Sequence, residues 1–220
     1  MAARLTAARP SAVLLDLDGT LVDSEPLWSA AAGALARAHG HPWTGADDAA
    51  IVGWSVPAVS SYLRARGVPL APERIARELH AGVAAALDDG VPWRPGALRL
   101  LAMLRRVGVP RALVTMTYRA LAVTVTESLP AGMFDVVVGG DEVDRPKPDP
   151  QAYLRAARSL GVDARACVAL EDSPTGVQSA LASGAWTYAV DPNQALPGRL
   201  TSHPRLRRLD GLDSAMAALS

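Results

Sequence analysis

The sequence predicts an α/β fold: a parallel β-sheet with helices on both faces, and a helical domain inserted into it. Three observations lead to this prediction. Short, continuous apolar runs recur along the chain, segments with helical periodicity separate them, and residues 24–92 contain helical patterns but no convincing strand. Alternation of strand and helix is typical of parallel sheets, because a parallel connection usually crosses the sheet through a helix.

Five apolar runs are the expected strands, at residues 11–18, 111–117, 134–140, 166–172 and 186–190. Most are rich in Val or Leu and lack a polar alternation, which suits strands buried on both faces. Helical patterns cover residues 95–108, 118–129, 149–161 and 173–185. The expected core is therefore a three-layer, Rossmann-like parallel sheet.

The inserted region is expected to be all-helical, with helical patterns over residues 26–40, 56–67 and 72–89. Turn-rich segments stand at its two ends, DSEP and DDGVPWRPG, and both suit a hinge. We expect a discontinuous core of residues 1–23 and 93–220, and a helical cap of residues 24–92.

Composition excludes several classes of protein. Basic and acidic residues number 22 each, so nothing suggests a nucleic-acid partner or a polybasic membrane anchor. No apolar run approaches the ~18 residues of a membrane span. The arginine-bearing N-terminus is a poor signal peptide, because Asp16 interrupts its apolar core. The single cysteine, Cys167, lies in an apolar run and is expected to be a buried packing residue. We expect a soluble, cytoplasmic monomer.

Acidic residues stand at the ends of two expected strands. Asp16 and Asp18 end the first strand, and alternation along an extended chain would send both side chains to the same side. Glu171 and Asp172 end the fourth strand. In an open parallel sheet these ends share one edge, which is where ligands bind. Carboxylates so close together are costly without a cation, and Mg²⁺ is expected because the ligands offered are hard oxygens.

Groups suited to an anion stand at the same edge. Thr115 and Thr117 end the second strand, and Lys147, the only lysine of the chain, follows the third. Pro148 biases Lys147 toward an extended conformation, and Asp149 with Pro150 is typical of a helix start. A compact ammonium on such a stiff segment suits a phosphate oxygen. Thr117 fits this role less well than Thr115, which itself could be only a β-branched strand residue.

Taken in order, the segments DLDGT, Thr115, KPDP and LEDSPTG resemble the four motifs of the haloacid dehalogenase superfamily. The inserted region resembles the helical cap of that family. The stretches DSEPLW and LGVDARACVALEDS are most similar to its sugar phosphatases, which act on hexose and hexitol phosphates. The resemblance implies a Mg²⁺-dependent phosphatase of a small phosphorylated metabolite, with a sugar or polyol phosphate expected.

The resemblance also implies a role for each motif residue. Asp16 would be the nucleophile that becomes an aspartyl-phosphate. Asp18 would protonate the leaving oxygen and then activate water, while its backbone carbonyl binds Mg²⁺.

The remaining roles concern the metal and the phosphate. Asp172 would bind Mg²⁺ directly, and Glu171 would support the metal site without a direct bond, although a purely structural role for this acid stays open. Thr115 and Lys147 would hold the phosphoryl oxygens. This division suits phosphoryl transfer, which depends on positioning and charge neutralisation.

The sequence bears on three other functions. A sugar phosphomutase is the nearest alternative, but related mutases commonly carry a histidine where this chain has Trp28 and a basic residue near Val56. Dehalogenases of the superfamily lack the second acid of the first motif, and Asp18 is present. A non-catalytic binding protein on this fold would be expected to have lost a motif residue, and all are retained.

Substrate specificity is expected to lie in the cap. Its candidates are Trp28, Trp43, Trp54 and Arg64, with Trp28 nearest the hinge; each of them is more often a packing or surface residue. The four histidines lack metal-ligand spacing and are expected at the surface: His39, His41, His80 and His203. The pairs Asp47–Asp48 and Asp88–Asp89 are expected at solvated helix ends.

Overall fold

The computed structural model describes residues 9–52, 54–191, 193 and 195–220, so part of the N-terminal stretch used in the signal-peptide argument lies outside it. The chain divides into two compact units. One consists of the residues up to Val22 together with Trp93–Ser220, and the other of Asp23–Pro92. They are called the core unit and the helical unit below.

The core unit contains a parallel sheet in the order β3-β2-β1-β4-β5-β6. Its strands are β1 (Ala12–Leu15), β2 (Arg111–Val114), β3 (Val136–Val138), β4 (Cys167–Glu171), β5 (Trp186–Ala189) and β6 (Leu206–Arg208). The first five correspond to the predicted apolar runs. The edge strand β6 was not predicted, because its segment, LRR, carries no apolar run.

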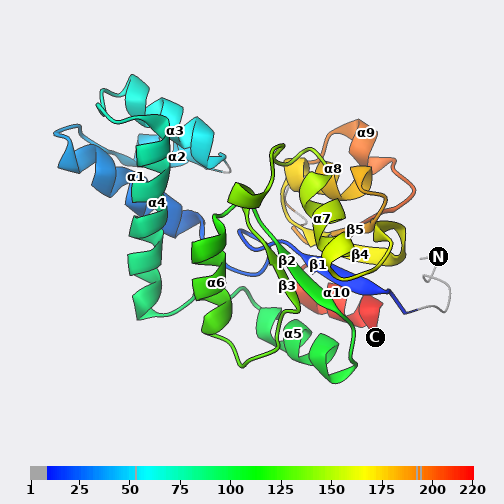
Figure 1. The fold of residues 1–220 in the computed structure, drawn as a ribbon. Helices are drawn as coiled ribbons and strands as arrows, with labels where there is room; N and C mark the ends of the chain where they lie inside the picture. Colours follow the sequence, from blue (N-terminus) through cyan, green and yellow to red (C-terminus); the bar gives the residue numbers. More distant parts are fainter. Residues whose placement is uncertain (1–8, 53, 192, 194) are drawn as a thin grey trace. The chain divides into compact units, whose positions relative to one another are not determined.

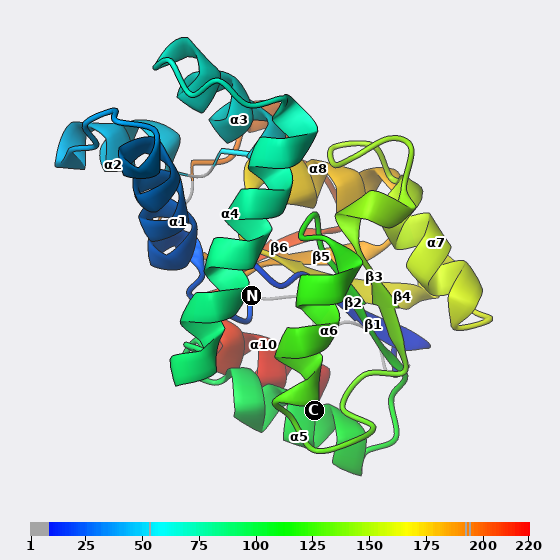
Figure 2. The same ribbon diagram turned by 60° about the vertical axis from the view of Figure 1, so that its left-hand side comes forward.

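Helices cover both faces of this sheet (Figure 1 and Figure 2). On one face lie α7 (Gln151–Ser159) and α8 (Pro174–Ala182), and on the other α5 (Ala97–Arg106) and α10 (Leu212–Leu219). The remaining core elements are α6 (Arg119–Glu127), α9 (Gly198–Thr201), and the 3-10 turns η2 (Gly140–Glu142) and η3 (Ala164–Ala166). The predicted α/β class is confirmed.

Small side chains line the contact between the sheet and α7. Ala12 and Leu14 of β1 share a buried cluster with Ala152, Ala156 and Ala157 of α7. Ala152 and Ala156 lie one helical turn apart and so share one face of the helix, with Ala157 next to them. A face of this kind has little bulk and lets the helix lie close to the sheet.

The strand register brings three strand ends to one edge. Leu15, the last residue of β1, pairs with Leu113 of β2 on one side and with Leu170 of β4 on the other. The chain leaves β1 toward β2 and later returns to β4 on the opposite side, which is the arrangement that opens a crevice in doubly wound sheets. The segments after β1, β2 and β4 therefore meet there.

The helical unit contains α1 (Glu25–Ala38), α2 (Gly45–Ile51), α3 (Val56–Ala65), α4 (Pro72–Ala86) and the 3-10 turn η1 (Leu87–Asp89). Its buried side chains include Ala32 and Ala36 of α1 and Ile75, Leu79 and Val83 of α4. The short helix α2 was not predicted. Of the helices that the structure describes, in either unit, none has the length and apolar character to cross a membrane.

Asp47 is buried, which corrects its expected place at a solvated helix end. Its carboxylate is 1% exposed and accepts hydrogen bonds from the Thr44 backbone N–H at 2.8 Å and from the Tyr62 hydroxyl at 2.7 Å. It also pairs with Arg66. Asp47 thus caps the start of α2 and ties it to α3, because a buried carboxylate needs partners for each oxygen.

His80 is also buried, at 7% exposure, so the expectation that all four histidines lie at the surface is wrong for this one. A ring nitrogen of His80 lies 2.7 Å from the carbonyl oxygen of Ala76, one turn earlier in α4. Its ring meets Trp28 edge-on, with 5.0 Å between ring centroids. His80 is therefore a packing residue of the helical unit.

We expect Asp47→Ala to lower the stability of the helical unit by about 2 kcal/mol, because it removes the buried, charged acceptor that Thr44, Tyr62 and Arg66 share. The matched control is Asp88→Ala, which removes the same carboxylate from an exposed position in the same unit. Urea unfolding followed by circular dichroism measures both. Equal midpoints for the two variants would contradict the structural role of Asp47.

Candidate active site

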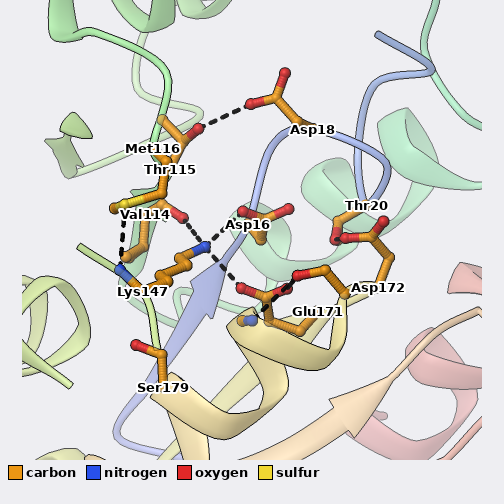
Figure 3. Close-up of polar contacts among 12 residues, drawn as sticks. Asp16, Asp18, Thr20, Val114, Thr115, Met116, Lys147, Glu171, Asp172 and Ser179 are labelled. Atoms are coloured by element: carbon orange, nitrogen blue, oxygen red, sulfur yellow. Dashed lines mark hydrogen bonds and ion pairs between the residues drawn. The ribbon is translucent and has the colours of Figure 1, made fainter. Parts of the chain in front are cut away.

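Lys147 is the centre of the site at this edge (Figure 3). Its Nζ donates to Asp16 Oδ1 at 2.6 Å, to Glu171 Oε1 at 2.6 Å and to the carbonyl oxygen of Val114 at 3.0 Å. These partners come from the ends of β1, β4 and β2, and the lysine side chain is only 5% exposed. An ammonium has three N–H donors, so every one of them has an acceptor.

The DRPKPDP segment is fixed on both sides of Lys147. The Lys147 backbone N–H points to Met116 Sδ at 3.4 Å. Helix α7 begins at Gln151, one residue later than the expected start at Pro150, and Asp149 Oδ1 accepts from the Gln151 N–H at 2.9 Å. Ser179 of α8 donates to the Asp149 carbonyl oxygen at 2.6 Å. The lysine therefore stands on an anchored turn.

Three carboxylates gather next to the ammonium. Asp16, Glu171 and Asp172 each offer an oxygen within 4.8 Å of the others. Burial raises the pKa of Asp16 well above its usual value, and the charge of Glu171 adds to this, although Lys147 acts in the opposite direction. Burial and Glu171 raise the pKa of Asp172 to about 7, against the lowering effect of the hydrogen bond from Thr20. The cluster holds more negative charge than one lysine balances.

These residues fit a divalent cation. The donor set consists of carboxylate oxygens alone, which Mg²⁺ prefers over the nitrogen and sulfur ligands that favour zinc. The raised pKa values of Asp16 and Asp172 show that additional positive charge would stabilise the ionised cluster. Asp16, Glu171 and Asp172 could therefore hold a metal ion.

Asp18 lies apart from this cluster. Its Oδ2 accepts a hydrogen bond from the Thr115 hydroxyl at 2.9 Å (Figure 3). The Thr117 hydroxyl donates to the same oxygen at 2.8 Å. The Asp16 and Asp18 carboxylates therefore have different partners, although strict alternation along a strand would send both side chains to the same side. The strand ends at Leu15, and Gly19 follows with a φ of 78°, so the alternation rule stops before Asp18. Thr117, the less favoured of the two threonines, is part of the site.

Glu171 is fully buried, and its two oxygens are held by protein donors. Oε1 accepts from Lys147 and from the Tyr153 hydroxyl at 2.6 Å, and Oε2 accepts from the Ser173 hydroxyl at 3.3 Å. Gly176 of α8 lies so close that a Cβ there would collide with this carboxylate. Such an environment suits an acid that supports the site rather than one that binds the metal directly.

Sequence reasoning missed two of these contacts. Tyr153 could be placed on the buried face of α7 from its spacing with Ala152 and Ala156, but its partner depends on how α7 lies against β4. Thr20 donates to Asp172 Oδ1 at 3.1 Å across a separation of 152 residues. No local sequence pattern reports a contact of that kind.

The aromatic candidates for specificity lie in the helical unit. Trp28 packs on His80, and Trp54, 46% exposed, meets the Tyr62 ring edge-on at 5.7 Å. Trp43 donates its indole N–H to Asp48 at 2.7 Å. Contact of Trp28 or Trp54 with a substrate stays a prediction.

A family model named haloacid dehalogenase-like hydrolase matches residues 10–184, most of the chain and all four motifs. This chain belongs to that family. The predicted resemblance is thereby confirmed.

Relatives of this haloacid dehalogenase-like hydrolase include two curated proteins. Hexitol phosphatase A of Escherichia coli is 34% identical over 183 residues, which are 81% of this chain and 82% of that protein. The bifunctional riboflavin kinase/FMN phosphatase of Arabidopsis thaliana is 33% identical over 184 residues, which are 82% of this chain but only 48% of that protein. The chain thus spans about half of that second relative.

Among solved structures, CbbY from Rhodobacter sphaeroides in complex with phosphate aligns with a TM-score of 0.80 and 28% identity, covering 96% of this chain and 99% of that one. The predicted fold is confirmed by this likeness. The predicted enzyme class, a phosphoric monoester hydrolase of the haloacid dehalogenase type, agrees with the family and its phosphatases.

We expect Mg²⁺ to raise the melting temperature of the chain, because it neutralises the acidic cluster in the folded state only. A ligand at about 100 times its Kd stabilises by about 2.7 kcal/mol. Differential scanning calorimetry with Mg²⁺ or with EDTA measures this. Asp172→Asn should remove most of the shift, whereas Asp210→Asn, the same change at an exposed position, should keep it. A shift that survives Asp172→Asn would contradict this metal site.

Proposed function

We propose that this hydrolase cleaves the phosphate monoester of a small sugar or polyol, with Asp16 as the nucleophile. One observation carries the proposal: the Asp16 carboxylate follows a buried central strand, bonds to the Lys147 ammonium and forms part of an acidic cluster suited to a metal ion. The arrangement thus places a nucleophile, a positively charged hydrogen-bond donor and a metal site next to one another, as phosphoryl transfer requires.

In the first step an oxygen of Asp16 attacks phosphorus and the bond from phosphorus to the ester oxygen breaks. Lys147 neutralises charge on the attacking carboxylate and on the phosphoryl oxygens. Its short bond to Asp16 supports this role, because two anions otherwise repel each other on approach. The product of this step is an aspartyl-phosphate and an alcohol, which splits one difficult displacement into two.

Asp18 is proposed to move the protons. Its carboxyl group donates a proton to the leaving oxygen, and its carboxylate then takes a proton from the water that attacks the aspartyl-phosphate. That second attack releases inorganic phosphate and restores Asp16. Thr115 and Thr117 support this role because their hydroxyls donate to Asp18 Oδ2 and so hold the carboxylate in place. Thr115, which directly follows β2, also remains a proposed phosphoryl ligand, and its hydroxyl would turn from Asp18 to donate to a phosphoryl oxygen.

When bound, the metal ion supplies charge neutralisation that lets an anionic carboxylate approach an anionic ester. We propose Mg²⁺, held by Asp16, Asp172 and the backbone carbonyl of Asp18, with Glu171 supporting the site. The chemistry of the donors supports this set, as does the commitment of both Glu171 oxygens to protein donors.

The substrate class rests on the relatives. Hexitol phosphatase A acts on a hexitol phosphate by its name, and CbbY was solved with phosphate bound. The experiment is a screen of phosphorylated sugars, polyols and other small metabolites with released phosphate as the measurement. Isomerisation of a sugar phosphate without phosphate release would instead support the mutase alternative. Cleavage of none of these esters would overturn the proposal.

Asp16→Asn should abolish phosphate release while the chain stays folded, because an amide cannot attack phosphorus as a carboxylate does. Steady-state assays with any accepted ester, beside a thermal melt, measure both effects. Asp210→Asn serves as the control for loss of one negative charge. The nucleophile assignment is wrong if the Asp16→Asn variant is folded and keeps more than about 5% of the parent activity.

Lys147→Arg should lower kcat/KM by about tenfold or more, on the scale of preorganised charge contacts to a transferring group. The groups around the ammonium explain why. Two carboxylates, a carbonyl oxygen and the Tyr153 ring surround a single nitrogen, so the broader guanidinium would displace Asp16. Lys147→Ala should lose more. Parent kinetics in a well-folded Lys147→Arg variant would mean that the lysine does not act as a compact charge.

A further inference from the structure

Tyr153 is completely buried in α7, and its hydroxyl points at the acidic cluster. The hydroxyl donates to Glu171 Oε1 at 2.6 Å, the same oxygen that accepts from Lys147 at 2.6 Å. Lys147 Nζ also lies 5.1 Å from the centre of the Tyr153 ring, within the range of a cation–π contact. One side chain therefore contacts both partners of a buried ion pair.

The Tyr153 hydroxyl restricts where the Glu171 carboxylate can turn. Without this donor, Lys147 alone would hold Glu171 Oε1, and a metal ion in the nearby acidic cluster would compete with Lys147 for that oxygen. Gly176 limits the space on the other side of the same carboxylate. Burial, with the charge of Glu171, raises the pKa of the phenol well above its usual value, so it remains a proton donor.

We propose that Tyr153 is a positioning residue of the phosphatase: its hydroxyl holds Glu171 in the orientation that fixes the Lys147 ammonium beside Asp16. The residue touches neither the nucleophile nor a substrate in this scheme. It acts through Glu171 on Lys147. The inference rests on the proposed function for its effect on catalysis, but the placement of Lys147 can be measured separately.

The test compares two buried tyrosines that lose only a hydroxyl. Tyr153→Phe keeps the ring and removes the bond to Glu171. Tyr188→Phe is the matched control: Tyr188 is 1% exposed on β5, and Arg207, rather than the acidic cluster, is the charged group that acts on it. With p-nitrophenyl phosphate as substrate, kcat should fall about tenfold for Tyr153→Phe, the usual effect of losing a contact that orients a site, and stay at the parent value for Tyr188→Phe.

The single lysine provides a second measurement that needs no turnover. In protein isotopically labelled at lysine Nζ, the ammonium of Lys147 is the only lysine side-chain signal in an NMR spectrum. Its three hydrogen bonds and burial should slow exchange of its protons with water. We expect Tyr153→Phe to shift this signal and speed the exchange, and Tyr188→Phe to leave both unchanged.

The outcomes separate the two proposals. Loss of kcat together with a changed Lys147 signal supports the positioning role. A fall in kcat with an unchanged signal overturns it, as does a changed signal with parent kcat, or no change in either. If the parent releases no phosphate from any ester, the proposed function fails, while the Lys147 signal still decides whether Tyr153 positions the ammonium.

Discussion

The rest of the site depends on an imbalance of charge: two buried carboxylates and a third, partly buried one lie close together beside a single ammonium. Lys147 bonds directly to Asp16 and Glu171, while Asp172 accepts a hydrogen bond from the Thr20 hydroxyl. Burial of unbalanced charge opposes folding, so such a cluster is better explained by what it binds than by what it stabilises. Strands β1, β2 and β4 offset this cost, because their apolar residues are at most 3% exposed.

The sequence was sufficient for those parts of the fold that leave a local pattern. Continuous apolar runs identified β1 to β5, and the residues at their ends, Asp16, Thr115 and Glu171, proved to meet at one edge because parallel strands in register end together. Elements without such a pattern were missed. Strand β6 is three residues long and mostly arginine, and α2 is a helix of two turns. Pairing with β5, rather than propensity, determines β6, and contacts of Asp47 with Thr44 and Tyr62 hold α2 in place.

The site was predictable in its composition but not in its geometry. Alternation along a strand placed Asp16 and Asp18 on the same side, yet the strand ends before either residue, and the two carboxylates have different partners. That separation matters for the proposed chemistry, since a nucleophile and a proton donor need different surroundings. The same limit applied to Asp47, which looked like a solvated helix end and is instead held by residues of two helices. Contacts between distant segments decide these roles.

The three hydrogen bonds of Lys147 limit how its ammonium can bind a phosphoryl group. Its ammonium has no donor to spare, so a phosphoryl oxygen can be bound only if one present acceptor gives way. Glu171 is fixed by Tyr153, and the Val114 carbonyl belongs to the sheet. Asp16 is the acceptor that changes during the proposed reaction, because its negative charge passes to the phosphoryl group as the new bond forms. The hydrogen bond can then follow the charge from Asp16 to a phosphoryl oxygen without movement of the lysine. A site arranged in this way needs a rigid anchor on the far side of the ammonium, and the Glu171–Tyr153 pair occupies that position.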